Sequence, residues 1–341
     1  MIAVKWDAAC DPGWCKQEYR EIIQMIPAGR RGIALAVLLL SALGVLPAAA
    51  ATYPDKPITL LEPYPAGSIS DIGARVLARE LSTELGQPVR VVDATGGSTG
   101  VAASMLQQQR ADGYTMFWDV VADLAYVIAS KELPYSAQDY QGVARLGGEA
   151  AGLIARTDDP RFANFAAMMS YANAHPGTVS IATGGVGLLK KACDDLQSVT
   201  HIKAKSVPYA GGSEEIAALL GSHIDLAITA PSNVANNDKL RVIALLTSDK
   251  DYPPLPNIPT MGALGYKMDS LLIRGVFVKK GTPAPIVSRL ATATQKAMQS
   301  AAWHQFTKRF AQTEDTGGPD VTNAYLQHLV EDWNNYLGKS R

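Results

Sequence analysis

Short apolar runs alternate with segments of helical periodicity along the chain from residue 53 onward. The runs 58–62, 89–92 and 114–118 have the length and composition of buried strands. The apolar positions between the first two runs predict one face of a helix, which Gly86 ends: Ile72, Val76, Leu77, Leu81 and Leu85. This alternation is typical of a largely parallel sheet with helices on both faces.

A second series of apolar runs begins near residue 153. It predicts strands at 153–155, 179–182, 203–207, 224–229 and 240–247, with helical segments between them. The prolines within 253–259 then predict a stiff, extended connector. A strand at 275–279 follows, and Gly318-Pro319-Asp320 opens the last predicted helix.

Four of the predicted strand-to-helix turns are rich in glycine and hydroxyl side chains: residues 65–71, 94–100, 183–187 and 208–213. Ligands of open α/β sheets bind at the carboxyl ends of strands, and backbone N–H groups at helix N-termini can hold an anion. The available hydroxyl donors are Ser68, Ser70, Ser98, Thr99, Thr183 and Ser213. Each turn alone is also an ordinary tight turn, but their recurrence predicts a cleft that holds a carboxylate.

The first 51 residues differ from the rest of the chain. Arg30 and Arg31 precede an apolar segment that ends in small residues, which predicts a secretory signal peptide cleaved after Ala50 or Ala51. The same segment is almost long enough for a transmembrane anchor, which is the alternative. Because Met25 opens a complete signal peptide by itself, we hypothesise that translation starts there.

Charge and cysteine content narrow the class of protein. The 341-residue chain has a formal net charge of −1, so no electrostatic footprint for nucleic acid is visible. Two of the 3 cysteines, Cys10 and Cys15, lie in the leader, which leaves Cys193 alone in the exported part. We therefore expect a soluble periplasmic protein that is stabilised by its hydrophobic core and not by disulfides.

One motif points to an enzyme. Gly96-Gly97-Ser98-Thr99-Gly100 matches G-x-S-x-G between a predicted strand and helix, as in the nucleophile elbow of serine hydrolases. Ser98 follows only the second strand, however, so little chain precedes it to build the loop that donates the oxyanion hole. A glycine-rich binding or structural turn is the competing interpretation.

Other reactive side chains do not predict a cofactor or a metal ion. The histidines lack metal-ligand spacing: His175, His201, His223, His304 and His328. The sequence contains no P-loop and no Cys-x-x-Cys pair. Cys193 is followed by Asp194 and Asp195, whose charges would raise the thiol pKa and make it a poor nucleophile.

Several segments, in order, carry a resemblance to a known family. They are YPDKPITLLEPYPAGSISDIGAR from Tyr53, LGQPVRVVDATGGSTGVAA, ADGYTM, KELPY, VPYAGG with ALLGSHID, NIPTMGALGY and GVFVKKGTPAPIVSRL. The chain from Tyr53 onward resembles the extracytoplasmic solute-binding receptors of tripartite tricarboxylate transporters, the Bug receptors. Matches this numerous and in this order are highly specific.

The resemblance implies an α/β fold, that of a two-domain hinged periplasmic binding protein (type II-like), in which each domain is a mixed, mostly parallel sheet flanked by helices. It places domain one at 53–152 plus 275–341 and domain two at 153–274, after the leader and signal peptide at 1–51. It implies a receptor and not an enzyme. The expected partners are a small organic carboxylate and the membrane subunits of the transporter, and we expect a monomer.

The same resemblance implies which residues bind the ligand, largely through backbone groups and bridging waters. In domain one they are Tyr64, Ala66, Gly67, Ser68, Ser70, Asp71, Thr95, Gly97, Ser98 and Thr99, with Arg274 on the returning strand. In domain two they are Thr183, Gly184, Gly185, Val186, Lys190, Lys191, Tyr209, Gly211 and Thr229.

This chain departs from the family where Leu188-Leu189-Lys190-Lys191 replaces hydroxyl, His or Asp side chains, where Thr229 replaces a frequent Asp, and where Ile273 replaces Trp. One hypothesis is that Lys190 or Lys191 pairs with a distal carboxylate of the ligand, and the alternative is a solvated lysine pair. The predicted function is delivery of a carboxylate to a transporter. An exported serine hydrolase using Ser98 and an orphan receptor with a sensing partner remain as alternatives.

Overall fold

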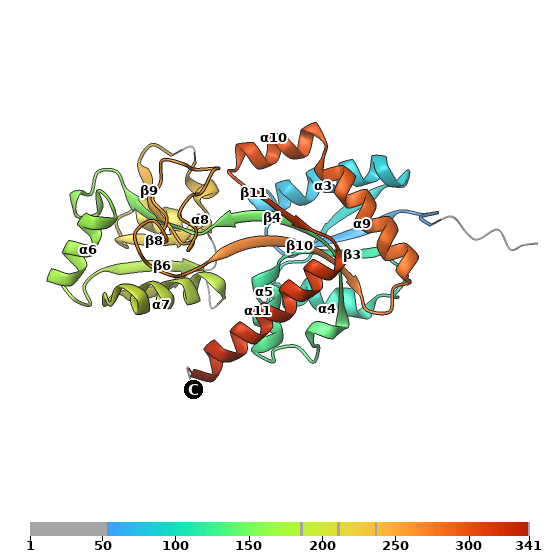
Figure 1. The fold of residues 1–341 in the computed structure, drawn as a ribbon, viewed down its shortest axis with the longest axis horizontal. Coiled ribbons are helices and arrows are strands. Elements are labelled where there is room, and N and C mark those ends of the chain that lie inside the picture. Colours follow the sequence, from blue (N-terminus) through green and yellow to red (C-terminus); the bar gives the residue numbers. More distant parts are fainter. Residues whose placement is uncertain (1–52, 185–186, 210–211, 236, 340–341) are drawn as a thin grey trace, which may run out of the picture. The chain divides into compact units, whose positions relative to one another are not determined.

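The computed structural model describes residues 53–184, 187–209, 212–235 and 237–339. These residues form two mixed sheets, each flanked by helices (Figure 1). The prediction of two mixed sheets is therefore confirmed. The predicted leader, signal peptide and start at Met25 lie outside the described residues, as do the site predictions Gly185, Val186 and Gly211.

The first sheet has six strands in the order β11-β4-β10-β3-β1-β2. They are β1 (Ile58–Glu62), β2 (Val89–Asp93), β3 (Thr115–Val120), β4 (Tyr140–Ala150), β10 (Leu271–Lys279) and β11 (Thr313–Gly317). The strand β1 pairs in parallel with both β2 and β3, whereas β10 and β4 add antiparallel pairs. Segments from both ends of the described chain therefore build one sheet.

The second sheet has five strands in the order β7-β6-β8-β5-β9. They are β5 (Gly152–Arg156), β6 (Ser180–Gly184), β7 (Lys205–Tyr209), β8 (Leu226–Thr229) and β9 (Leu240–Leu245). The strand β6 lies between β7 and β8 and is parallel to both, while β5 is antiparallel to β8 and β9. Antiparallel pairs are thus at least as frequent as parallel ones among the described strands, contrary to the expected parallel majority.

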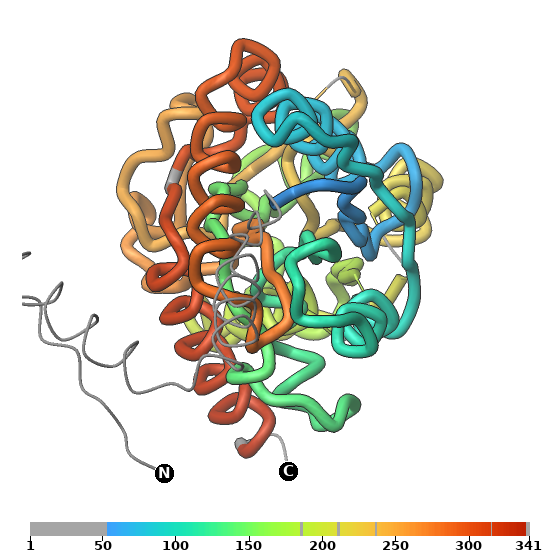
Figure 2. Tube along the Cα trace, turned by 90° about the vertical axis from the view of Figure 1, so that its right-hand side faces the viewer, coloured from blue at the N-terminus to red at the C-terminus, as the bar shows by residue number. Residues whose placement is uncertain are grey.

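Helices cover both faces of each sheet. The buried side chains therefore form two separate clusters on each sheet, one on either face. On the first sheet, one face is covered by α3 (Ile69–Leu85), α9 (Ala284–Met298) and α10 (Ala301–Arg309), and the other by α4 (Gly100–Gln108), α5 (Val121–Ala129) and α11 (Pro319–Lys339). On the second sheet the helices are α6 (Phe165–Ala174), α7 (Leu188–Thr200) and α8 (Gly212–Leu220). Figure 2 shows the red C-terminal helices running past elements from the blue and green N-terminal half.

The buried face of helix α3 differs in part from the predicted one. Leu77, Leu81 and Leu85 are buried as expected, but Ile72 is 37% exposed. Ala74 and Ala78 complete the buried stripe instead, since small residues let the helix approach the sheet closely. Gly86 ends the helix in the left-handed conformation with φ 69°, which confirms the predicted C-terminal cap.

The two sheets are connected where β4 passes into β5. Only Ala151 separates Ala150, the last residue of β4, from Gly152, the first of β5. The Ala151 N–H donates to Ser270 O (2.8 Å), the Leu246 N–H donates to Ala151 O (2.7 Å), and the Ser270 N–H donates to Leu246 O (2.8 Å). Three buried residues from distant parts of the sequence therefore form one hydrogen-bonded crossing, next to the start of β10 (Figure 1).

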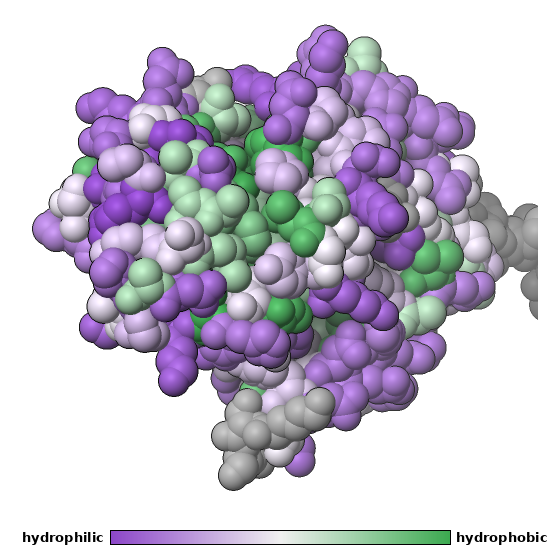
Figure 3. Space-filling view, turned by 60° about the vertical axis from the view of Figure 1, so that its left-hand side comes forward, coloured by the Kyte–Doolittle hydropathy of each residue, from purple (hydrophilic) through white to green (hydrophobic). Residues whose placement is uncertain are grey.

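Apolar and hydrophilic residues are unevenly distributed over the face that Figure 3 shows. Figure 3 shows one face on which apolar residues lie among hydrophilic ones. Within the described residues, no helix combines the length and the apolar character needed to cross a membrane.

Candidate functional site

The predicted ligand loops follow strands that run in the same direction. Glu62 at the end of β1 is in register with Asp93 at the end of β2. In the second sheet, Gly184 at the end of β6 is in register with Tyr209 at the end of β7. The loops after β1 and β2 therefore lie at one edge of the first sheet, and the loops after β6 and β7 at one edge of the second.

The loop after β1 is held by its own side chains. The Ser68 hydroxyl accepts a hydrogen bond from the Asp71 N–H (3.1 Å) and so caps α3. The Asp71 carboxylate accepts from the Gly67 N–H (2.8 Å) and pairs with Arg75 at 2.7 Å. Ser68 and Asp71 are therefore engaged within the loop, while Ala66 and Gly67 are exposed.

The loop after β2 has an unusual backbone. Four consecutive residues have positive φ: Gly96 (122°), Gly97 (56°), Ser98 (48°) and Thr99 (79°). Serine and threonine rarely adopt this conformation, and such strain is most common at functional sites. Thr95, Gly97 and Ser98 are exposed, whereas Thr99 begins α4 and is buried. Successive N–H groups in a loop of this kind can form an anion-binding concavity.

A hydrogen-bonded cluster joins the loop after β1 to the end of β3 and the start of α5. The Tyr64 hydroxyl lies 2.9 Å from Asp119 Oδ1 and 2.8 Å from Asp123 Oδ2. Burial, and next the charge of Asp123, raises the pKa of Asp119 well above its usual range. Burial also raises the pKa of Asp123. The single phenol proton of Tyr64 is thus shared between two carboxyl groups, and the pKa of each carboxyl group is raised.

Two further buried polar groups lie beside this cluster. Burial raises the pKa of Glu62 to about 8, although its Oε1 accepts a hydrogen bond from the Tyr64 N–H (3.3 Å). The Thr99 hydroxyl lowers the pKa of Asp119. Nevertheless, Glu62 Oε2, Asp119 Oδ2 and Thr99 Oγ1 are buried and make no hydrogen bond of ordinary geometry with another described group.

Asp123 also contacts the start of α7, a helix that packs on the second sheet. The Leu188 N–H at the start of α7 donates a hydrogen bond to the Asp123 carboxylate and lowers its pKa. Asp123 Oδ1 lies only 3.2 Å from the position that a Cβ on Gly187 would occupy. Gly187 is the N-cap of α7 and offers no side chain to its free N–H groups. The carboxylate of Asp123 therefore occupies the helix terminus that the sequence assigns to a ligand anion.

Two predicted ligand residues of the second sheet, Thr183 and Thr229, are more buried than the loops after β1 and β2. The Thr183 hydroxyl is buried against the Ser206 hydroxyl at 3.2 Å. Thr229 is also buried, and its hydroxyl accepts a hydrogen bond from Asn233 Nδ2 (3.0 Å). Close to both Thr229 and Gly184 lies Glu215, whose pKa burial raises to about 7.

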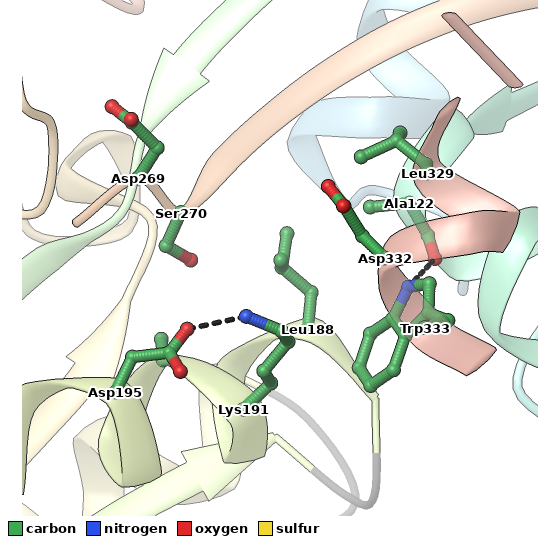
Figure 4. Close-up of a pocket in the computed structure, with 10 residues that line it drawn as sticks. Ala122, Leu188, Lys191, Asp195, Asp269, Ser270, Leu329, Asp332 and Trp333 are labelled. Carbon is green, nitrogen blue, oxygen red and sulfur yellow. Dashed lines mark hydrogen bonds and ion pairs between the residues drawn. The ribbon is translucent and has the colours of Figure 1, made fainter. Parts of the chain in front are cut away.

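Lys190 and Lys191 have partners within α7. Lys190 pairs with Asp194, and Lys191 pairs with Asp195 at 2.5 Å. Figure 4 shows Lys191 at a cavity of about 60 Å³ that also adjoins α11, where Trp333 Nε1 donates to Ala122 O (2.9 Å). Among the described residues, Lys191 is the only predicted ligand-binding residue that lines this cavity.

Two other predicted residues belong to buried networks. The Ser70 hydroxyl accepts a hydrogen bond from Trp118 Nε1 (2.8 Å) beneath α3. Arg274 donates to Gln312 and lies 3.8 Å from Glu149. The structure thus brings Tyr64, Thr99 and the start of α7 together around Asp119 and Asp123, and engages Ser70 and Arg274 elsewhere.

Glu62, Asp119 and Asp123 were not among the site residues predicted from the sequence. A signal was present, since each acid adjoins an apolar run whose neighbours are buried. An ionisable group in such a run is rarely buried without a role. Among the described residues, no group of three or more His, Cys, Asp or Glu side chains is placed to hold a metal ion.

The chain is similar to known proteins over most of its length. Residues 73–335 match the family described as "Tripartite tricarboxylate transporter family receptor". A UPF0065 protein in the gbd 5' region of Cupriavidus necator is 30% identical over 302 residues, which cover 82% of this chain and 86% of that protein. The protein BugT of Bordetella pertussis is 28% identical over 294 residues, covering 84% and 90%.

Solved structures share the fold. MatC from Rhodopseudomonas palustris with bound malate has a TM-score of 0.72 at 22% identity, covering 83% of this chain and 99% of that one. A second R. palustris protein, with adipate, has a TM-score of 0.73 at 24% identity, covering 83% and 96%. The periplasmic binding protein BugD has a TM-score of 0.71 at 23% identity, covering 84% and 98%. The match of residues 73–335 and the 30% identical relative show that the chain belongs to the tripartite tricarboxylate transporter receptor family.

Proposed function

We propose that this receptor captures a small organic carboxylate between its two sheets and delivers it to the membrane subunits of a tripartite tricarboxylate transporter. The observation that carries the proposal is the approach of the β1 loop, the β3 end and the α7 start around Tyr64 and Asp123. Structures of the same fold contain malate and adipate, which are dicarboxylates.

In this proposal the protein is exported by a signal peptide and acts in the periplasm as a monomer. Domain one comprises 53–152 plus 275–341, and domain two comprises 153–274. The allocation of β1–β4, β10 and β11 to one sheet and β5–β9 to the other supports this division.

The exposed backbone of the loop at Thr95, Gly97 and Ser98 is the best-placed anion site. Its backbone N–H groups are the donors that a ligand carboxylate would meet there. We also propose that the remaining predicted residues contact the ligand. Tyr64 and Thr99 are supported by their position at Asp119 and Asp123.

Thermal unfolding of the chain from residue 52 onward, across a panel of mono-, di- and tricarboxylates, tests the proposal. A ligand that binds only the folded state stabilises it by about 2.7 kcal/mol at a hundred times its dissociation constant. Saturable stabilisation without turnover of the acid is the expected result. If no acid in the panel raised the melting temperature, the proposal would be contradicted.

Two substitutions test the lysine hypothesis. Lys190→Ala and Lys191→Ala should each weaken dicarboxylate binding if the lysines exchange Asp194 and Asp195 for a ligand carboxylate. Unchanged affinity in both variants would leave the ion pairs within α7 as their role. A matched control is Lys267→Ala, which removes a lysine from the connector between β9 and β10.

The serine hydrolase alternative has its own test. Ser98 makes no hydrogen bond to a histidine among the described residues, although a nucleophilic serine needs a base within reach. Ester hydrolysis that Ser98→Ala abolished would nevertheless favour the enzyme. Capture of a ligand with no transporter subunits encoded nearby would favour the orphan receptor with a sensing partner.

A further inference from the structure

The C-terminal part of α11, which packs on the first sheet, contacts the first turns of α7, which packs on the second (Figure 4). The Tyr336 hydroxyl donates a hydrogen bond to Asp194 Oδ2 (2.5 Å). The ammonium group of Lys191 lies 5.6 Å from the centre of the Tyr336 ring, which is within the range of a cation–π interaction. Leu188 packs against the same buried cluster as Tyr336. Three side chains of α7 therefore contact elements of the other sheet.

Tyr336 is held on the first sheet by its neighbour Trp333. The Trp333 residue is 2% exposed, and its Nε1 donates a hydrogen bond to Ala122 O (2.9 Å) in the first turn of α5. The rings of Trp333 and Tyr336 pack edge to face with their centres 5.5 Å apart. A rotation of the second sheet that moved α7 away from α11 would therefore break the hydrogen bond between Tyr336 and Asp194.

Packing between the two helices is incomplete beside the crossing. A cavity of about 60 Å³ lies there, and Ser270 of the crossing lines it together with Leu188 and Trp333 (Figure 4). Ser270 is 1% exposed, and its hydroxyl makes no hydrogen bond with another described group. Helices packed as tightly as a protein core would lose many dispersion contacts on separating. The cavity reduces that loss, so the contact between α7 and α11 suits an interface that opens and closes.

The hydrogen bond between Tyr336 and Asp194 is charge-assisted but accessible to water. Its acceptor is a carboxylate, and hydrogen bonds to charged groups are stronger than those between neutral groups. Burial, and next this hydrogen bond, raises the pKa of Tyr336, which keeps the phenol protonated as the donor. The Asp194 side chain is 33% exposed and pairs with Lys190, whose side chain is 37% exposed. Water can therefore hydrate Asp194 when Tyr336 moves away, and the contact is reversible.

We infer that Tyr336 and Asp194 form a latch between α11 and α7, which stabilises the closed arrangement, in which these two helices are in contact. All groups of the latch belong to the chain itself, so it contributes with or without a ligand. A ligand that binds the closed arrangement binds more tightly as the closed fraction rises. The effect of the latch on binding rests on the proposed function, whereas its effect on the arrangement of the sheets depends on no ligand.

Spin labels on elements of the two sheets test the latch without a ligand. The chain from residue 52 onward would carry Arg79→Cys in α3 and Asp158→Cys after β5, where the native side chains are 75% and 81% exposed. Its native Cys193 is buried. Double electron–electron resonance would give the distribution of distances between the labels. In Tyr336→Phe and Asp194→Asn, we expect the ratio of closed to open molecules to fall about threefold to tenfold.

The dissociation rate of a bound acid is the second measurement. Stopped-flow displacement of malate or adipate should show dissociation about threefold to tenfold faster from Tyr336→Phe than from the unsubstituted chain. Tyr336 is not among the predicted ligand residues, so loss of a direct ligand contact would not explain the change. The matched control is Tyr266→Phe, which removes a half-buried phenol hydroxyl at the second sheet and should change neither the distances nor the rate.

The outcomes separate the latch from the proposed function. Unchanged distances and an unchanged dissociation rate in Tyr336→Phe would overturn the latch and leave the proposed function intact. A lower melting temperature of Tyr336→Phe with unchanged distances would also overturn it, since the hydroxyl would then only stabilise α11. If no acid of the panel bound but the distances changed as expected, the proposed function would be overturned and the latch supported.

Discussion

Glu149 and Ser232 are joined by two hydrogen bonds, although one lies in a strand of the first sheet and the other follows a strand of the second. Glu149 lies in β4, and Ser232 lies in the short helix η4 (Pro231–Val234) after β8. The Ser232 hydroxyl donates to Glu149 Oε1 (2.7 Å), and the Ser232 N–H donates to Oε2 (3.1 Å). Gln312 Nε2 donates to the same carboxylate at 2.9 Å. One buried carboxylate thus joins three distant segments.

Glu149→Ala should be among the most destabilising single substitutions. It removes three hydrogen bonds and leaves Arg274 buried beside no carboxylate, so we expect a loss of about 3–5 kcal/mol in the free energy of unfolding. Ser232→Ala removes one donor and should cost about 1–2 kcal/mol. Urea denaturation measures both. Equal, small losses in the two variants would show that the network contributes little.

Gly148 should tolerate no side chain. A Cβ on Gly148 would lie 2.0 Å from the backbone oxygen of Leu272 in β10, and backbone cannot move aside as a side chain does. Gly148→Ala should therefore lower the free energy of unfolding by about 3 kcal/mol or more. The matched control is Gly338→Ala in α11, where open space surrounds the position and alanine should stabilise the helix by about 0.5–1 kcal/mol.

Glu215 should make stability depend on pH. Its pKa is raised to about 7 in the folded state, so the folded state binds the extra proton between about pH 4.5 and 7. The stability contributed by that proton is present below pH 4.5 and is lost as the pH rises to 7, a change of about 3 kcal/mol. Glu215→Gln should therefore stabilise the protein at pH 8 and have little effect at pH 4.

Thermal or chemical unfolding at several pH values checks this expectation. Glu214→Gln changes the neighbouring exposed carboxylate and serves as the control. A Glu215→Gln variant whose gain in stability was the same at pH 4 and pH 8 would contradict the explanation by burial.

Cys193 should be unreactive in the folded protein. It is fully buried in the core of the second sheet, and burial, followed by the charge of Asp194, raises its pKa to about 11. A thiol reagent such as DTNB should label the chain from residue 52 onward only when denaturant is present. Rapid labelling under native conditions would mean that helix α7 opens locally at a free-energy cost far below that of global unfolding.

Features encoded by neighbouring residues could be predicted from the sequence. The strand β1 begins and ends at the predicted residues, and Gly86 caps α3, because both depend on local apolar pattern and backbone preference. The strand β4 was missed because its glycines, including Gly142 and Gly148, weaken the strand signal. These glycines are explained only by close neighbours such as Thr322 and Leu272, which are distant in the sequence.

The same limit applies to the candidate site. The loops at 64–71 and 95–100 were identified from their glycines and hydroxyl groups, and Ser68 proved to cap α3. Asp119 and Asp123 acquire their roles from Tyr64 and Leu188, which lie more than fifty residues away. No local pattern encodes such contacts, so the acidic character of the site became evident only in the structure.

The crossing formed by Ala151, Leu246 and Ser270 constrains how the protein can move. Two chain connections join the sheets, one through Ala151 and one from Leu246 to Ser270, and each of these three residues donates one backbone hydrogen bond to another and accepts one from another. Rotation of one sheet against the other would have to change dihedral angles beside this ring, because breaking its buried hydrogen bonds would cost free energy. Because both chain connections pass through this ring, we expect any rotation of one sheet against the other to centre on it, where a small torsion would move the distant loops by a larger distance.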